Sequence, residues 1–396
     1  MKIITTTDSL AKFCKKAKSA PFIALDTEFM RERTFYSQLC LIQMATPDDE
    51  AILDPLAEGI DLSPFLSILA NTDIEKVMHA ARQDMEIFYQ LLGKVPAPLF
   101  DTQIAAMALG FGENIGYLAL VKGRLGINLD KGARFTDWAR RPLSENQLNY
   151  ALADVTHLRD LYPGMCRELT KKGRMDWVRE EMLSMGDPHL YDFDPERAWM
   201  RLKPRMFRQD YLAALKAAAA WREREAQAKD IPRGRVLKDD GIYVIAQRKP
   251  KRVKDLNNVR GIPNGFANRK TAAVLIEDIQ KAIANAADYA PNTVRKQQMP
   301  SGLGPSVDML KTLLRLRTEY EDIAPRLVAN VADLTDLAAF GKKANVRALS
   351  GWRRKVFGED ALKMLNGEIS LTLKDKKVVA VPCLPQSVPK SVSQNI

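Results

Sequence analysis

Short apolar runs broken by polar residues recur through the first part of the chain. KIITT, PFIALDTEF, CLIQMAT and EAILDP are rich in β-branched and apolar residues and are bounded by proline, aspartate or glycine, as strands are. The last three follow one another too closely for helical crossovers, which predicts an antiparallel meander. DSLAKFCKKAK, ARQDMEIFYQLLG and DTQIAAMALG have helical periodicity, and a longer amphipathic segment follows Ser144, a predicted N-cap. Residues 1–185 are therefore predicted to form an α/β domain.

The pattern changes after residue 185. Prolines interrupt the periodicity in residues 186–204, which are expected to be a linker. Helical patterns then dominate, and the chain repeats itself: DIPRGRVLKDDGIYVIA begins at Asp230 and DIAPRLVANVADLTDLA begins 92 residues later, at Asp322. Two small helical domains are predicted, at 205–290 and 305–376, joined by a connector at 291–304. The serine- and proline-rich residues 377–396 are expected to be a disordered tail.

Composition narrows the class of protein. A chain of 396 residues is too long for one ordinary domain, and no apolar run reaches the ~18 residues of a membrane span. The N-terminal segment lacks the apolar core of a secretory signal, and the four cysteines are scattered. These features predict a cytoplasmic protein with reduced thiols and no membrane contact. Three histidines argue against a zinc site, and the absence of a GxxxxGK[ST] loop argues against an ATP-driven helicase.

Positive charge is concentrated in the middle of the chain. Residues 190–300 carry 23 lysines and arginines against 13 acids, which is nearly all of the net charge of +11. This asymmetry predicts a reaction module attached to a region that binds a polyanion, with an ordinary solvated surface as the alternative. The candidate nucleic-acid-binding cations of the first helical domain are Arg233, Arg235, Lys249, Lys251, Arg252 and Lys254. Such cations would contact phosphates without reading bases.

Four carboxylates in the α/β domain suit a divalent-metal site. Asp26 and Glu28 are two residues apart in a predicted strand, so both side chains leave the same face. Tyr150 and Asp154 are four apart on a predicted helix and also share a face. Taken singly, Asp26 with Glu28, and Asp84, fit exposed acids better than a site, whereas Tyr150 with Asp154 fits a core tyrosine beside an exposed acid equally well. Together with Asp84 they predict a site for hard cations, which prefer carboxylate oxygens.

Two other polar residues near this group are interpreted differently. Asp101 is expected to cap the helix that follows it rather than to bind metal. His79, five residues before Asp84, is expected to close a strand.

The order of these motifs resembles the DEDD exonuclease superfamily, in the subgroup whose third motif is Y-x-x-x-D. The sister subgroup has histidine where Asn149 stands. LDTEFMRERTFYSQLCLIQMA, DKGARFTDWARRPLSENQLNYALADVTHLRDLY and WREREAQAKDIPRGRVLKDD are similar to bacterial ribonuclease D, and the likeness extends over residues 1–375. The resemblance implies an RNase H-like mixed sheet flanked by helices, followed by two small all-α domains of the HRDC type.

The resemblance also implies an activity. It is a two-metal-ion 3′→5′ exoribonuclease that releases nucleoside 5′-monophosphates and trims 3′ extensions of tRNA precursors and other structured RNAs. Asp26, Glu28 and Asp154 would hold one Mg²⁺ or Mn²⁺. Asp26 would share a second ion, with Asp84 acting through water, and Tyr150 would orient the nucleophile. No obligate protein partner is implied.

Two alternatives stay open at this point. A DNA 3′→5′ exonuclease would use the same acids, since discrimination rests on contacts to the 2′-hydroxyl. A non-catalytic nucleic-acid-binding protein that keeps an old nuclease fold is the alternative from another class. The intact set of acids argues against it, because unused buried acids would destabilise the fold.

Overall fold

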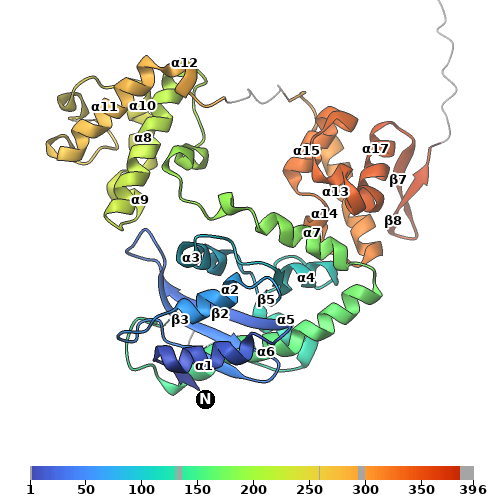
Figure 1. The fold of residues 1–396 in the computed structure, drawn as a ribbon. Coiled ribbons are helices and arrows are strands. Elements are labelled where there is room, and N and C mark those ends of the chain that lie inside the picture. The colour runs from blue at the N-terminus through green and yellow to red at the C-terminus, as the bar shows by residue number, and fades with distance from the viewer. Residues whose placement is uncertain (1, 130–131, 133–135, 258, 293–298, 384–396) are drawn as a thin grey trace, which may run out of the picture.

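The computed structural model describes residues 2–129, 132, 136–257, 259–292 and 299–383, which form three parts (Figure 1). We call them the N-terminal domain (β1 to α7), the first helical domain (η2 to α12) and the second helical domain (α13 to β8). Each part has its own large cluster of buried apolar side chains. The N-terminal domain carries the acidic residues, so its sheet is described first.

A six-stranded mixed sheet in the order β1-β4-β3-β2-β5-β6 forms the centre of the N-terminal domain. β2, β3 and β4 pair antiparallel, so the predicted meander is confirmed, whereas β1–β4, β2–β5 and β5–β6 pair parallel. β5 is the strand that His79 was expected to close, whereas β6, with three residues, was not predicted. The strands are β1 Ile3–Ile4, β2 Phe22–Met30, β3 Gln38–Ala45, β4 Glu50–Leu53, β5 Glu75–Met78 and β6 Leu99–Asp101.

One long helix, α6, lies along this sheet and contacts β2, β3 and β4. It begins at the predicted cap, where Ser144 Oγ accepts from the Gln147 amide at 3.3 Å. Leu148 and Ala151 on its first turns pack against Leu41 of β3. The helices of this domain are α1 Thr7–Ala17, α2 Ser63–Ala70, α3 Arg82–Leu92, α4 Thr102–Ala108, α5 Tyr117–Leu125, α6 Glu145–Lys171 and α7 Met175–Met185.

The predicted linker, residues 186–204, is ordered. Two 3-10 helices occupy much of it, each with a proline in its first turn. Phe193, Ala198 and Leu202 are buried with α8, because the residues between the prolines are apolar enough to join its core. The elements from this segment to the end of the first helical domain are η1 Pro188–Leu190, η2 Pro195–Arg201, α8 Gln209–Ala228, α9 Arg233–Val236, α10 Asp239–Arg248, η3 Val253–Leu256, η4 Phe266–Asn268, α11 Lys270–Ala284 and α12 Ala286–Tyr289.

The second helical domain repeats the middle of the first. α9 and α14, and likewise α10 and α15, begin and end 92 residues apart, the offset of the sequence repeat. Asp230 and Asp322 precede these helices with positive φ angles of 46° and 52°. The elements of this domain are α13 Gly304–Glu321, α14 Pro325–Val328, α15 Val331–Phe340, η5 Gly341–Lys343, η6 Arg347–Leu349, α16 Gly351–Arg353, the π-helix η7 Arg354–Gly358, α17 Glu359–Leu365, β7 Ile369–Lys374 and β8 Lys377–Pro382.

The prediction of a disordered tail from residue 377 was wrong for its first part. β8 pairs antiparallel with β7 across a two-residue turn at Asp375 and Lys376, both with positive φ. Apolar residues alternate along β7 and are continuous over 378–381 in β8, and both patterns are compatible with strands. Residues 384–396 lie outside the described residues.

Both helical domains contact the N-terminal domain through the same corner of the repeat. In the first copy, Asp230 Oδ1 accepts from the amides of Phe35 (2.9 Å) and Tyr36 (3.1 Å), which follow β2. In the second copy, Arg174 donates to the carbonyl of Asp322 at 3.2 Å. The residue two positions later, Ala324, donates its amide to a carbonyl of α4 at 2.9 Å.

Two further expectations concern the chain as a whole. Across the described residues, no helix has both the length and the hydropathy that a membrane span requires. Cys14, Cys40, Cys166 and Cys383 are all free thiols.

Replacing Asp230 by alanine should loosen the first helical domain from the loop after β2. The change removes one carboxylate acceptor from two backbone amides, which costs about 1–3 kcal/mol. Hydrogen exchange measured by mass spectrometry should therefore quicken at residues 31–37 and stay slow in β3. Asp240→Ala is the matched control, because Asp240 is exposed and pairs with exposed Arg205. Equal protection of residues 31–37 in both variants would contradict the docking role.

Candidate active site

Three carboxylates from β2 and α6 meet above the sheet. Asp26 and Glu28 leave the same face of β2, the face along which α6 lies, and Asp154 comes from α6. One oxygen from each carboxylate lies within 4.8 Å of the others. Residues more than 120 positions apart thus form one acidic group, in the arrangement that the i, i+2 and i, i+4 spacings predicted.

The fourth acid, Asp84, approaches β2 from α3. It lies in the first turn of that helix and is buried, at 7% exposure. The hydroxyl of Thr27, the residue between Asp26 and Glu28, donates to Asp84 Oδ1. Thr27 leaves the opposite face of the strand, so Asp84 is held behind the three-carboxylate group rather than within it. The negative charge of Asp84 nevertheless raises the pKa of Asp26.

Crowding and burial disfavour ionised carboxylates here. Burial raises the pKa of Asp26 well above its ordinary value, and the neighbouring charges of Asp154, Asp84 and Glu28 raise it further. Burial also raises the pKa of Asp84 to about 6, against the lowering effect of the Thr27 hydroxyl. A cation would relieve this repulsion, and a set of carboxylate oxygens without sulfur or imidazole suits Mg²⁺ or Mn²⁺.

Tyr150 stands beside the acids on the wall of a cavity of about 650 Å³ that Asp26 and Asp154 also line. Its ring lies 6.1 Å from that of buried Trp138. The loop that carries Trp138 is pinned by Arg141, which donates to both oxygens of Asp54 at 2.6 and 2.7 Å. This packing holds Trp138 beside the tyrosine, and it gives Trp138 and Arg141 of the DWARR segment a structural role.

Sequence reasoning missed three residues that line the same cavity: Gln103, Tyr117 and Lys122. The Tyr117 hydroxyl donates to the Ala153 carbonyl at 2.9 Å, next to Asp154. Burial raises the pKa of Tyr117, and the negative charges of Asp154 and Asp26 add to this, so it remains a donor. Lys122 is exposed and is the sole lysine or arginine among the described lining residues. These residues lie in the short helices α4 and α5, and no spacing of residues there pointed to a site.

His79 and Asp101 have the roles expected of them. His79 follows β5, and its ring nitrogens contact Thr102 Oγ1 at 3.0 Å and the Ile115 carbonyl at 3.1 Å. Because both nitrogens are engaged and burial lowers its pKa, His79 is a neutral wall residue rather than a metal ligand. Asp101 caps α4 by accepting from the Gln103 amide at 2.8 Å.

The six candidate cations of the first helical domain fall into two groups. Arg233 pairs with the buried carboxylate of Glu223 and lies over the Phe35 ring at 4.4 Å, and Lys249 pairs with Asp210. The other four are exposed; Arg252 makes a 3.4 Å contact with Asp255, and the other three have no acidic partner within the described ranges. These four are Arg235, Lys251, Arg252 and Lys254.

Comparisons with known families match two parts of the chain. A family model described as 3′-5′ exonuclease matches residues 1–170, and one described as HRDC domain matches residues 212–277. The exonuclease match covers every acid of the site. One HRDC match is found, in the first helical domain.

Comparisons with whole proteins extend over nearly the full chain. Ribonuclease D of Nitrobacter hamburgensis is 46% identical over 96% of this chain and 99% of its own, and ribonuclease D of Sphingobium indicum is 44% identical over 95% and 97%. The crystal structure of Escherichia coli RNase D, described as an exoribonuclease involved in structured RNA processing, is 31% identical and superposes with a TM-score of 0.78. It covers 93% of this chain and 98% of its own.

Asp84→Asn should stabilise the metal-free protein at pH 8 and have less effect at pH 5. The folded state holds the Asp84 proton more tightly than the unfolded chain does, with a pKa of about 6 against an ordinary 3.8. The free energy of unfolding of the wild type therefore falls as pH rises through this interval, and the variant escapes a loss of about 1–3 kcal/mol. Urea unfolding in EDTA at both pH values measures the difference. Surface Asp73→Asn is the control, and an equal gain at both pH values would contradict the assignment.

Proposed function

Since this chain belongs to the ribonuclease D family and is a 3′-5′ exoribonuclease, we propose that Asp26, Glu28, Asp84, Tyr150 and Asp154 form its active site. The observation that carries the proposal is the meeting of three carboxylates within 4.8 Å, from β2 and α6. The exonuclease match supports it, because residues 1–170 contain all five side chains.

The family's fold implies divalent metal ions, and we propose two Mg²⁺ or Mn²⁺ ions at this site. Asp26, Glu28 and Asp154 would hold one, and Asp26 would share the other with Asp84, which would act through water because it is not one of the three grouped carboxylates. When bound, such ions activate a water and stabilise the leaving 3′ oxygen. The elevated pKa values of Asp26 and Asp84 support this ligand set, since a cation removes their mutual repulsion.

Tyr150 would orient the attacking water by hydrogen bonding. A phenol with an ordinary pKa near 10 is protonated at neutral pH, so it is a donor and a poor base. Its packing beside Trp138 supports a positioning role, because the ring is held next to Asp154 on the cavity wall. The products would be nucleoside 5′-monophosphates, released one at a time.

The substrates that we propose are tRNA precursors and other structured RNAs with 3′ extensions. The E. coli relative, an exoribonuclease involved in structured RNA processing, supports this class. Arg235, Lys251, Arg252 and Lys254 are exposed on the first helical domain and would contact backbone phosphates. Arg233 and Lys249, being paired with acids, would instead hold the domain together. A cytoplasmic location is proposed from the free thiols and the RNA substrate.

We also infer that residues 305–376 are a second, diverged HRDC-type domain. The identical 92-residue offsets of two helix pairs and of their preceding aspartates support a duplication. The domain limits proposed are 1–185 for the exonuclease, 186–204 for the link, 205–290 for the first HRDC domain, 291–304 for the connector and 305–376 for the second.

Asp26→Asn and Asp154→Asn should each lower kcat by at least about 10³-fold, or about 4 kcal/mol, because each removes a charged ligand from the metal site. Release of mononucleotides from a 3′-extended RNA measures the loss. Asp160→Asn, an exposed acid on the same helix, should leave kcat unchanged. Circular dichroism shows whether the variants fold. Retained hydrolysis in a folded Asp26→Asn or Asp154→Asn protein would overturn the ligand assignment.

The purified protein should release mononucleotides from a 3′-extended tRNA with Mg²⁺ or Mn²⁺ and lose this activity in EDTA. A single-stranded DNA matched to the 3′ extension should be degraded more slowly, because it lacks the 2′-hydroxyl groups that distinguish RNA. Initial rates with each metal establish which ion the site prefers. Equal rates on DNA would favour a general exonuclease, and binding of RNA without release of nucleotides would favour the non-catalytic alternative.

A further inference from the structure

A second and larger cavity lies between the N-terminal and second helical domains. Its volume is about 1170 Å³, above the 300–1,000 Å³ typical of small-molecule sites. Ala80 and Gln103 line both this cavity and the one that holds Asp26 and Asp154, so the two adjoin. Its walls come from α4 and α7 on one side and from α13, α14 and α15 on the other, which lie next to each other in Figure 1.

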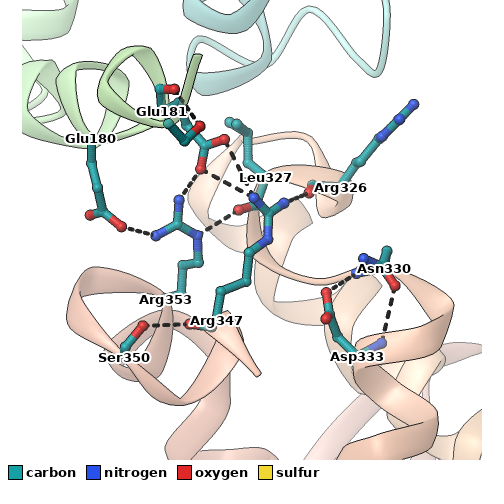
Figure 2. A network of polar contacts seen from close by, with 10 residues as sticks. Glu180, Glu181, Arg326, Leu327, Asn330, Asp333, Arg347, Ser350 and Arg353 are labelled. Atoms are coloured by element: carbon teal, nitrogen blue, oxygen red, sulfur yellow. Dashed lines mark hydrogen bonds and ion pairs between the residues drawn. The ribbon is translucent and has the colours of Figure 1, made fainter. Parts of the chain in front are cut away.

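The walls are held at a fixed separation by a buried ionic contact. Arg353, at 2% exposure, pairs with Glu180 and Glu181 of α7 and donates to the Leu327 carbonyl at 2.8 Å. Arg347 also reaches Glu181, at 3.3 Å, and Figure 2 shows the two arginines converging on α7. Beside them, the rings of Trp177 and Trp352 stack 4.1 Å apart. The cavity is therefore a defined part of the interface between the two domains.

The acids of this cavity all have hydrogen-bond or ion-pair partners, whereas the guanidinium groups of two of its arginines have no acidic partner among the described residues. Each lining acid is engaged: Asp101 and Glu113 by backbone amides, Asp333 by the Asn330 amide, and Glu181 by the two arginines. Arg315 is exposed and has no acidic partner in the part of the chain that the structure describes. Arg326 is also exposed; its guanidinium donates to Asn114 Oδ1 at 3.3 Å, and its backbone amide donates to Glu113 Oε1 at 3.0 Å. The described lining carries five lysines and arginines against four acids, a small positive excess.

The metal-site cavity also adjoins a cavity of about 380 Å³, with Tyr150 and Asp154 in both walls. A polyanion that has one end at the acids can extend into the larger cavity, where Arg315 and Arg326 lie in the wall. Apolar side chains between the cations, from Ile104, Met107, Leu314 and Leu334, give sugars and bases a surface to pack on.

We propose that the second helical domain guides the single-stranded 3′ extension of the RNA: nucleotides upstream of the scissile phosphate pass through the larger cavity and their phosphates contact Arg315 and Arg326. This inference rests on the proposed function, since it takes the acids as the place of cleavage. The contact is made to phosphates and is independent of base sequence. It places a substrate-positioning role in the second helical domain.

The test compares substrate lengths in the full-length protein. Arg315→Gln and the double change with Arg326→Gln should raise KM about 3- to 10-fold for a single-stranded RNA of ten nucleotides and by less than twofold for a dinucleotide. The dependence of log affinity on log salt for the longer RNA should become shallower by about 0.7 for each lost phosphate contact. Lys343→Gln, an exposed cation of the same domain outside the cavity, should change neither quantity.

The remaining outcomes separate the guiding role of the second helical domain from the exoribonuclease function itself. Unchanged KM and salt dependence for the ten-nucleotide RNA in the double variant would overturn the guiding role while leaving the exoribonuclease assignment intact. An equal loss on the dinucleotide and the longer RNA would also overturn it, because it would indicate damage to the metal site. Failure of the wild type to hydrolyse any RNA would count against the proposed function itself. Thermal unfolding of each variant shows whether the two exposed substitutions leave the fold unchanged.

Discussion

Repulsion between closely spaced carboxylates is the constraint on which the rest of this structure depends. Asp26, Glu28 and Asp154 would separate if the chain allowed it, and the raised pKa of Asp26 shows the free energy that opposes their approach. The parts that hold them are a strand that pairs with β3 along the acids and with β5 just before them, a capped 27-residue helix along the sheet, and the Thr27 bond to Asp84. The scaffold stores unfavourable electrostatic energy that a divalent cation can release.

Much of the fold follows from local patterns in the sequence. The β2–β4 meander, the cap at Ser144 and the pairing of acids on shared faces depend on spacings of two and four residues, which a linear pattern records. β6, with three residues, is too short for such a pattern. The β7–β8 hairpin was hidden because its turn at Asp375 and Lys376 uses positive φ angles without glycine.

The site was predictable where motifs carry it and obscure where tertiary contacts do. DxE and Y-x-x-x-D identified four residues, but nothing in the sequence places Tyr117 or Lys122 on the same cavity wall. Charge counting identified a basic middle, yet it could not separate Arg233, which neutralises a buried glutamate, from exposed Arg235. Which cations lack an acidic partner is a property of the folded molecule, because pairs such as Arg233 with Glu223 and Lys249 with Asp210 form only when separate helices pack together.

The corner shared by the two helical domains has a consequence for how such a molecule is assembled. Asp230 and Asp322 begin the same turn in each copy. The turn at Asp230 contacts the loop after β2, whereas the turn at Asp322 contacts α4 and Arg174. The same turn thus docks against two unrelated surfaces of the N-terminal domain. After a tandem duplication, the newer copy would already have carried the docking turn and would have needed only a complementary surface on the N-terminal domain. Fewer changes would then separate a protein with one docked helical domain from a protein with two.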